Sequence, residues 1–426
     1  MTKKMNYKIL NIPLLNSNNI FTYSIGKEFF LYAPLSEIIC NVTEDEISDL
    51  ENELQEKSEK SKNELLNIIK ENKSEVFSIQ SLHQSNELTI LLNQICNFTC
   101  AYCYSAQGRS NVSLDTMKMR IILEYFICGN INSHLEIIFS GGGDPVLSFE
   151  KFSIGVEYAK VVAAKEGKTV SFGIVTNGSK LNDKYMDFII RNNIGLVVSF
   201  DILEDVHNKQ RSSYNVVAST LDKLISKGVT FGIRSTITPL NVNRMHEMVE
   251  ELHNRFPEAK SAAFEVVLND KLFASVDELR SFYTSFKENI FKTIDFGYNY
   301  GISIGNTIIN NIETCKNRSC FGKIVVTPDG NITACSRISS SKEDFFDYFL
   351  YGCIDNNSVN INYDKYDTLN KKNVYTYKEC SSCIAKWHCS GGCLLARHVY
   401  NEIYWSEYCR FMQDMTVETL IRKFNL

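Results

Sequence analysis

Three cysteines lie within one eight-residue stretch, residues 96–103 (CNFTCAYC), shortly after the apolar run 90–92. Cysteine thiolates are the usual ligands of iron–sulfur clusters, and an ordinary 4Fe–4S cluster takes four of them. Because the local count stops at Cys96, Cys100 and Cys103, a cluster bound here would keep one iron without a protein ligand. Such an iron at the end of a strand can bind and reduce a substrate or cofactor.

A second set of cysteines lies near the C-terminus. The chain has 14 cysteines, of which Cys40 and Cys128 stand alone, three form the stretch above and the others follow residue 314. A disulfide framework would require export, and no export signal is visible, so metal ligation is the better interpretation. The sequence therefore predicts two separate metal regions.

Composition excludes several function classes. A length of 426 residues suggests two to three domains. The net charge is −5 and basic residues are interleaved with acidic ones, so we expect no nucleic-acid partner. No segment reaches the roughly 18 uninterrupted apolar residues of a membrane helix, and the N-terminus leads into no apolar signal region. We therefore expect a cytoplasmic protein without a membrane partner.

The cysteine loop follows the first of six short apolar runs that alternate with helical patterns. The expected strands are 88–93, 135–139, 170–175, 196–200, 231–236 and 262–267, and the expected helices are 114–127, 149–164, 183–191, 216–226, 244–255 and 276–291. Six strand–helix units predict an α/β fold, in which a parallel sheet closes fully or partly into a barrel. Chemistry in such barrels lies at the C-terminal ends of the strands, where the cysteine loop would lie.

The regions on either side of this barrel differ from it. Extended pieces at 7–12, 29–33 and 37–42 precede helices, one of which should begin at the capping-box pattern Thr43 to Glu46. The stretch 51–73 is dense in Glu and Lys and is interpreted as a solvated helical face. After residue 310 the sequence predicts a hairpin around Asp329-Gly330, within a small, loop-rich region held together by metal. The expected domains are 1–85, 86–308 and 309–426.

The three-cysteine spacing, with Tyr102 before the third cysteine, resembles the signature of the radical S-adenosylmethionine (radical SAM) superfamily. The resemblance implies a partial (β/α)6 barrel and a 4Fe–4S cluster whose fourth iron is chelated by S-adenosylmethionine. A zinc site remains the alternative, although zinc usually finds a fourth Cys or His nearby and none lies in this loop.

Motifs after later strands extend this resemblance to the cofactor. A glycine-rich segment follows the second expected strand, where the superfamily carries a Gly-Gly-Glu-Pro-like motif that binds the methionine amino group; here Asp replaces Glu. Contacts to the ribose and methionine are expected after the third and fourth strands, and an arginine near the cofactor carboxylate is expected beyond them. A surface salt bridge is equally compatible with that arginine. By this resemblance the cofactor-binding residues are Tyr102, Gly141, Gly142, Gly143, Asp144, Thr176, Asn177, Ser199, Asp201 and Arg211.

The C-terminal cysteines resemble the seven-cysteine pattern of the SPASM domain, which holds two auxiliary 4Fe–4S clusters in many peptide-modifying enzymes. The alternative is a zinc ribbon. An eighth cysteine, Cys315, completes the set. The resemblance assigns Cys315, Cys320, Cys335 and Cys393 to the first auxiliary cluster, and Cys380, Cys383, Cys389 and Cys409 to the second. Cys40, Cys128 and Cys353 are expected to be buried inert thiols, and His388 and His398 to be packing or surface residues.

These resemblances imply an enzyme with three 4Fe–4S clusters and S-adenosylmethionine, which receives electrons from a donor such as flavodoxin or ferredoxin. The expected substrate is a ribosomal precursor peptide with a leader sequence, in which a thioether or carbon–carbon cross-link forms. Residues 1–85 are compatible with a winged-helix-like α+β domain that binds the leader as an added strand. The alternatives are an anaerobic sulfatase-maturing enzyme and a non-enzymatic iron–sulfur electron carrier. The sequence identifies no catalytic side chain.

Overall fold

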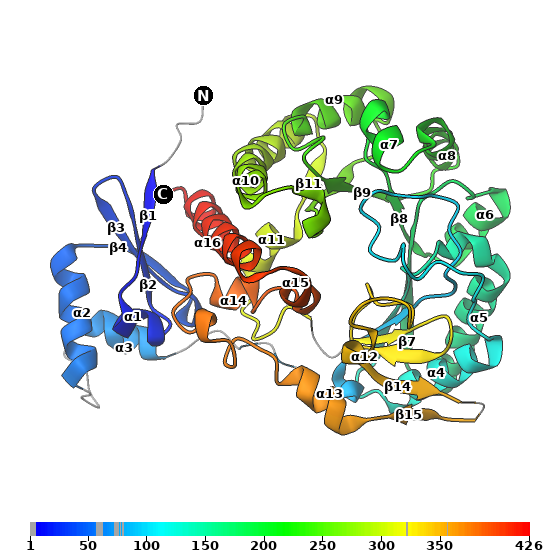
Figure 1. Cartoon of the computed structure of the whole chain (residues 1–426), viewed down its shortest axis with the longest axis horizontal. Helices are drawn as coiled ribbons and strands as arrows, with labels where there is room; N and C mark the ends of the chain where they lie inside the picture. Colours follow the sequence, from blue (N-terminus) through cyan, green and yellow to red (C-terminus); the bar gives the residue numbers. More distant parts are fainter. Residues whose placement is uncertain are drawn as a thin grey trace.

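A large, mostly parallel sheet forms the centre of the computed structural model, which describes residues 6–56, 63–71, 76, 78, 81–320, 323–355 and 357–426. Seven strands pair in parallel in the order β11-β10-β9-β8-β7-β6-β5 and curve into a partial barrel (Figure 1). These strands are β5 (Glu87–Ile90), β6 (His134–Phe139), β7 (Thr169–Thr176), β8 (Gly195–Ser199), β9 (Gly232–Ile237), β10 (Ser261–Val266) and β11 (Ser303–Gly305). The six expected strands are confirmed, and β11 is an addition too short to show a pattern in the sequence.

Helices cover the outer face of the curved sheet (Figure 1). They are α4 (Thr116–Gly129), α5 (Phe149–Lys165), α6 (Asp183–Arg191), α7 (Glu204–Gln210), α8 (Tyr214–Ser226), α9 (Met245–Arg255) and α10 (Val276–Asn299). On β6, Leu135, Ile137 and Phe139 are fully buried, whereas Glu136 between them is exposed. Since side chains alternate along a strand, the apolar set faces the helices and the other set faces the inside of the barrel.

The predicted hairpin joins the barrel sheet directly. It consists of β12 (Ile324–Val326) and β13 (Asn331–Thr333), which pair antiparallel. β12 also pairs in parallel with β5, and β14 (Leu350–Ile354) and β15 (Val359–Ile361) extend the sheet further. The hairpin prediction is confirmed, and Gly330 at its turn has the left-handed φ of 90° that favours glycine.

The expectation of a loop-rich C-terminal region is wrong for its last part. A 23-residue helix, α16 (Glu402–Phe424), carries Cys409 and packs along α10. Its apolar residues follow no clean one-sided stripe because the helix is covered by α10 on one side and by the N-terminal sheet on another. The other helices of this region are short: α11 (Thr307–Asn310), α12 (Phe346–Phe349), α13 (Tyr363–Asn370), α14 (Lys386–Cys389) and α15 (Leu394–Val399).

The N-terminal region, from β1 to α3, is a four-stranded antiparallel sheet in chain order with three helices. Its elements are β1 (Tyr7–Leu10), α1 (Pro13–Ser17), β2 (Phe21–Ile25), β3 (Glu28–Ala33), β4 (Ile38–Val42), α2 (Glu44–Glu56) and α3 (Glu64–Lys70). The predicted capping box is confirmed: the Glu46 amide donates to Thr43 Oγ1 at 3.2 Å, and the Thr43 amide donates to Glu46 Oε2 at 2.7 Å.

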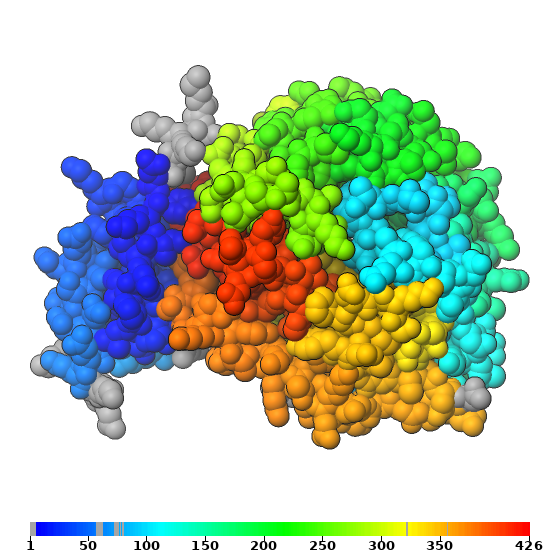
Figure 2. Space-filling model, viewed as in Figure 1, coloured from blue at the N-terminus to red at the C-terminus, as the bar shows by residue number. Residues whose placement is uncertain are grey.

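Both faces of this small sheet are covered. Leu31 and Ala33 pack with α2 and α3, whereas Phe30 and Tyr32 on the opposite face share an apolar cluster with Trp387 and residues of α16. In Figure 2 the N-terminal region (blue) lies directly against the C-terminal segment (orange and red). The interpretation of 51–73 as a solvated face is wrong for Leu66 and Ile69, which are buried; residues 57–62 and 72–73 lie outside the described part.

No helix within the described residues is long and apolar enough to cross a membrane.

The barrel core predicts where truncation of a side chain costs stability. Phe152 on α5 is fully buried, and its ring packs edge-on against Phe139 at 4.9 Å between ring centres. Phe152→Ala should lower the free energy of unfolding in urea by about 3–5 kcal/mol. The control Val161→Ala, at a 68% exposed position of the same helix, should change it by less than about 0.5 kcal/mol. Equal losses would contradict this packing.

Candidate functional site

The structure brings the three cysteines of residues 96–103 together beyond the C-terminal end of β5. Burial raises the pKa of the Cys100 thiol to about 11, and the neighbouring Cys103 and Cys96 thiols add to the rise. All three thiols belong to the same short loop, so the backbone of that loop sets the distances among them. Three adjacent thiols are a donor set that suits an iron–sulfur cluster.

Two polar side chains bind these thiols. Arg109 donates from Nη2 to Cys103 Sγ at 3.1 Å and from Nη1 to the Gly142 carbonyl oxygen at 2.6 Å. Asn177 Nδ2 lies 3.8 Å from Cys96 Sγ. Arg109 thus joins the third cysteine of the loop to the glycine segment. Arg109 was missed in the sequence, where six residues after the third cysteine it carries no recognisable pattern.

The glycine segment packs against the chain that enters the cysteine loop. The Gly143 amide donates to the Asn93 carbonyl oxygen at 2.7 Å, and the Asp144 amide donates to the Ile95 carbonyl oxygen at 2.8 Å. A Cβ atom on Gly143 would lie 2.1 Å from the Ile95 carbonyl oxygen. The glycine is therefore required for close backbone approach between these two segments.

Asp144 uses its carboxylate to join strand ends. Thr176 Oγ1 donates to it at 2.8 Å, the Asn177 amide at 2.7 Å and the Val146 amide at 3.0 Å. Burial raises the pKa of this carboxyl, and the hydrogen bonds from Asn177, Thr176 and Val146 oppose the rise. Both carboxylate oxygens are engaged within the protein, so the structure gives Asp144 a supporting contact to β7.

Tyr102, Asp201 and Arg211 form one buried hydrogen-bonded chain. The Tyr102 hydroxyl donates to Asp201 Oδ2 at 2.6 Å and accepts from Arg211 Nη1 at 2.7 Å. Asp201 also accepts from Gln210 Nε2 at 3.0 Å and from the Thr236 amide at 3.0 Å. Burial raises the pKa of the Asp201 carboxyl, and Arg211 opposes that rise. The cysteine loop is thus bonded through Tyr102 to β8 and β9.

One hydrogen-bond donor among Tyr102, Asp201 and Arg211 has no partner within the described residues. Arg211 Nε is buried and has no hydrogen-bond partner within the described residues. A buried guanidinium N–H without an acceptor is costly, and an anionic ligand such as a carboxylate would satisfy it. Ser199, by contrast, lies at the end of β8 on the side that faces the barrel interior, beside the buried Val198.

The backbone that follows Asp201 and Arg211 is strained. Ile202, directly after Asp201, has a φ of 65°, and Ser212 and Ser213, directly after Arg211, have φ values of 78° and 60°. A left-handed conformation is unfavourable for a β-branched residue, and such strain concentrates at functional sites. The surrounding structure therefore holds Asp201 and Arg211 in place at a cost to the local backbone.

The mouth of the barrel brings the first loop close to a C-terminal cysteine. The Arg337 guanidinium carbon lies 5.5 Å from the ring centre of Tyr104, and Tyr104 is 48% exposed. Packing around the inner part of this half-exposed side chain raises the pKa of Tyr104; Arg337 opposes the rise, and Cys103 and Cys335 add to it. Tyr104 and Arg337 thus lie between the two cysteine regions; neither was identified in the sequence.

The C-terminal cysteines form two groups. Burial raises the pKa of Cys335 to about 12, with contributions from Cys393 and Cys320. The second group has four members, because burial and three other thiols raise the pKa of Cys389. These three thiols are Cys383, Cys409 and Cys380. No three His, Cys, Asp or Glu side chains of the described residues are close enough to hold a single metal ion.

The Cys315 thiol bonds to the N-terminal region. Its thiol donates to the Pro34 carbonyl oxygen at 3.7 Å, and it belongs to the apolar cluster that contains Tyr32. Of the four thiols expected for the first auxiliary cluster, Cys320, Cys335 and Cys393 interact with one another, and the place of Cys315 among the ligands stays a prediction.

The remaining cysteines and histidines divide between surface and interior. The expectation of buried thiols is wrong for Cys128 and Cys353, which are exposed, and Cys40 is half-buried. Cys128 and Cys353 lie next to the last residues of α4 and β14, and Cys40 lies in the middle of β4. His398 packs against Tyr348 with 4.2 Å between ring centres, and the His388 ring is buried.

Sequence comparisons identify the central part of the chain. Residues 90–252 match the model of the Radical SAM superfamily. The serine-type anaerobic sulfatase-maturating enzyme of Klebsiella aerogenes is 22% identical over 322 residues, which span 70% of this chain and 76% of that enzyme. The radical SAM cyclopropyl synthase TigE of Paramaledivibacter caminithermalis is 21% identical over 427 residues, which span 91% of this chain and 82% of the synthase.

Solved structures agree on the fold. Native anSMEcpe with bound AdoMet superposes with a TM-score of 0.65 at 18% identity and covers 80% of this chain and 99% of its own. Streptococcus suis SuiB bound to precursor peptide SuiA superposes with a TM-score of 0.52 at 12% identity and covers 93% of this chain and 97% of its own. At these identities the likeness shows the α/β radical SAM fold.

The close approach at Gly143 predicts a sensitive position. Gly143→Ala should push the segment that enters the cysteine loop away, because the new Cβ would lie 2.1 Å from the Ile95 carbonyl oxygen. We expect at least about a tenfold increase in hydrogen exchange at the Asp144 amide, which corresponds to about 1.4 kcal/mol.

Gly195→Ala is the control, since its Cβ would meet an ordinary contact of 3.5 Å at the opposite end of β8. The account of the glycine segment fails if Gly143→Ala leaves exchange at the Asp144 amide unchanged.

Proposed function

We propose, with the radical SAM domain at residues 90–252 as the premise, that this chain modifies a ribosomally made precursor peptide by an oxidative cross-link. Cys96, Cys100 and Cys103 would hold a 4Fe–4S cluster that would supply the electron for cleavage of S-adenosylmethionine to methionine and a 5′-deoxyadenosyl radical. That radical would take one hydrogen from the peptide, and an auxiliary cluster would accept the second electron as a proton leaves. We choose a precursor peptide as substrate because TigE and SuiB match this chain over more than the barrel.

The residues around the cysteine loop have separate tasks in this proposal. Arg109 holds the Cys103 sulfur, to which it donates at 3.1 Å. Arg211 offers its unpartnered Nε to the carboxylate of S-adenosylmethionine, while its Nη1 holds the Tyr102 hydroxyl. The engaged carboxylate of Asp144 leaves the backbone of the glycine segment to contact the methionine amino group.

Similarity beyond the barrel favours a precursor peptide. TigE and SuiB match over 91% and 93% of this chain, shares too large to leave out all of residues 1–85, whereas the Klebsiella sulfatase-maturating enzyme spans 70%. SuiB has been solved with its precursor peptide SuiA. In the N-terminal sheet, β1 and β4 are edge strands, and a leader peptide would add to such an edge by main-chain hydrogen bonds.

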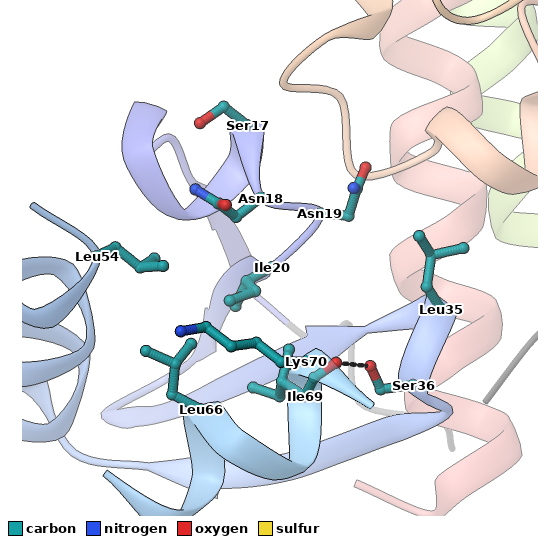
Figure 3. A pocket seen from close by; sticks show the side chains of 10 residues that line it. All are labelled: Ser17, Asn18, Asn19, Ile20, Leu35, Ser36, Leu54, Leu66, Ile69 and Lys70. Carbon is teal, nitrogen blue, oxygen red and sulfur yellow. Dashed lines mark hydrogen bonds between the residues drawn. The ribbon is translucent and has the colours of Figure 1, made fainter. Parts of the chain in front are cut away.

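A cavity beside this sheet offers a second contact for a leader. Its volume is about 250 Å³ and it lies between the α1–β2 loop, the turn after β3, and α3 (Figure 3). Its walls are partly apolar, with Lys70 at one side, which suits an apolar side chain flanked by a polar group. The lining residues are Ser17, Asn18, Asn19, Ile20, Leu35, Ser36, Leu54, Leu66, Ile69 and Lys70.

The C-terminal cysteines fit two auxiliary 4Fe–4S clusters, which would make three in the chain. Since Cys315 bonds to Pro34, we assign Cys320, Cys335 and Cys393 to the first auxiliary cluster, with one iron open to a substrate group. Cys380, Cys383, Cys389 and Cys409 would hold the second. Tyr104 and Arg337 at the barrel mouth would then contact a peptide that lies between the cluster of Cys96, Cys100 and Cys103 and the open iron of the first auxiliary cluster. A flavodoxin or ferredoxin would supply electrons.

Sulfatase maturation is the second candidate. Several curated relatives are sulfatase-maturating enzymes, and native anSMEcpe superposes with the TM-score of 0.65. Both candidates require a peptide substrate in the barrel, so they differ in the use of the N-terminal region. A non-enzymatic electron carrier is not retained, because the chain carries a radical SAM domain and its curated relatives are enzymes.

Cleavage of S-adenosylmethionine tests the enzyme activity. Anaerobic reconstituted protein with dithionite should form 5′-deoxyadenosine, and Cys100→Ala should reduce its formation to the background because only two thiols remain to hold the cluster. Cys128→Ala, at an exposed thiol on α4, should retain the wild-type rate. Chromatography of the quenched reaction measures the product. Formation by Cys100→Ala at the wild-type rate would contradict the site.

Leader binding tests the substrate class. Asn18→Trp should fill the cavity and weaken binding of the labelled leader of a precursor peptide encoded beside this gene by at least about tenfold, or about 1.4 kcal/mol. Fluorescence anisotropy measures the affinity. Glu28→Trp, at an exposed position of the inner strand β3, should bind as the wild type does. Equal affinity of Asn18→Trp and wild type would remove the cavity from the leader site.

A further inference from the structure

Three consecutive residues between Cys383 and Cys389 form hydrogen bonds with the N-terminal region. Lys386, Trp387 and His388 form the helix α14 in this interval, and each has less than a tenth of its surface exposed. Burial of a lysine, a tryptophan and a histidine in succession requires partners for their polar atoms. Asn19 and Tyr32 of the N-terminal region supply most of those partners, and the carbonyl groups of Asn311 and Thr314 supply the rest.

Asn19 accepts two hydrogen bonds from this segment. Its Oδ1 lies 3.0 Å from Lys386 Nζ and 3.2 Å from Trp387 Nε1. Asn19 has a left-handed φ of 60°, a conformation that asparagine tolerates better than most residues. The loop between α1 and β2 is therefore shaped to present one amide oxygen to both donors.

Tyr32 fixes the next residue. Its hydroxyl lies 2.6 Å from His388 Nε2, and the two rings stack at 5.9 Å between centres. The other ring nitrogen, Nδ1, lies 3.2 Å from the Asn311 carbonyl oxygen and 3.3 Å from that of Thr314. Since a carbonyl can only accept, Nδ1 carries the proton and Nε2 accepts from Tyr32. Both ring nitrogens are satisfied in this single tautomer, which fixes the ring.

A four-residue helix cannot hold its own conformation, because a single turn fixes more backbone freedom than its hydrogen bonds return. The position of α14, and with it that of the adjoining Cys389, depends on outside contacts. The contacts of its three buried polar side chains lie in the N-terminal region and the chain 311–314.

We propose that the N-terminal region is part of the metal site of the second C-terminal group, with Tyr32 and Asn19 as positioning residues for the segment that ends in Cys389. The inference rests on the proposed function, in that this group must hold a cluster. The N-terminal region thereby has a task besides leader binding, and Asn19 belongs to both, since it also lines the cavity of Figure 3.

Two conservative variants test the inference, and each has a matched control. Tyr32→Phe removes the hydroxyl from His388, and Tyr23→Phe removes a buried hydroxyl that has no partner within the described residues on the same face of the sheet. Asn19→Gly removes the amide without straining the backbone, and Asn193→Gly does the same at another left-handed asparagine, with a φ of 49°.

The measurements use the full chain after anaerobic reconstitution, without any peptide. They are iron and sulfide per chain and the midpoint potential of each cluster by electron paramagnetic resonance titration. Wild type should hold about twelve irons. Tyr32→Phe and Asn19→Gly should lose up to about four irons or move one midpoint potential to a more positive value, because a loosened segment admits water to the cluster. Their thermal midpoints should stay near that of wild type.

Two results would overturn the inference. Unchanged iron and potentials in both Tyr32→Phe and Asn19→Gly would show that these contacts do not position Cys389, and equal changes in the control variants would show a general packing effect. Failure of the proposed function would look different, because a wild-type count of about four irons would remove the auxiliary clusters, and this inference with them.

Discussion

The close backbone contact between the glycine segment and the chain that enters the cysteine loop is the constraint on which the site depends. Hydrogen bonds from the Gly143 and Asp144 amides to Asn93 and Ile95 seat the loop at the end of β5. The Asp144 carboxylate then fixes this segment to the end of β7, because it accepts hydrogen bonds from Thr176 and Asn177. A loop with three thiols has little structure of its own, so its geometry is imposed by these neighbouring strand ends.

The second organising feature is the shared sheet. β12 pairs with β5, so the strand that leads into the cysteine loop is also the strand from which the C-terminal region extends. The N-terminal sheet in turn packs with one face on the C-terminal helix α16. The three parts of the chain thus form one connected structure, in which the N-terminal region contacts the C-terminal cysteine segment.

Local signals in the sequence predicted much of this fold. The six strands, the hairpin at Gly330 and the capping box at Thr43 each depend on neighbouring residues, and each was found. The contacts missed were of another kind, because partners such as Tyr32 and His388 lie 356 residues apart. Arg109, the bonded carboxylate of Asp144 and the contact of Cys315 with Pro34 likewise depend on which segments the fold brings together, and no local pattern specifies that.

Mass spectrometry of a treated peptide shows whether this chain cross-links a precursor peptide. The reconstituted enzyme, with S-adenosylmethionine and a reductant, is given the full precursor peptide encoded beside its gene, the same peptide without its leader, and a peptide with a sulfatase active-site sequence. The account predicts the loss of two hydrogens from the full precursor, with fragment ions that mark a cross-link, and no change in the other two peptides. Oxidation of the sulfatase peptide to formylglycine, with the precursor unchanged, would contradict it.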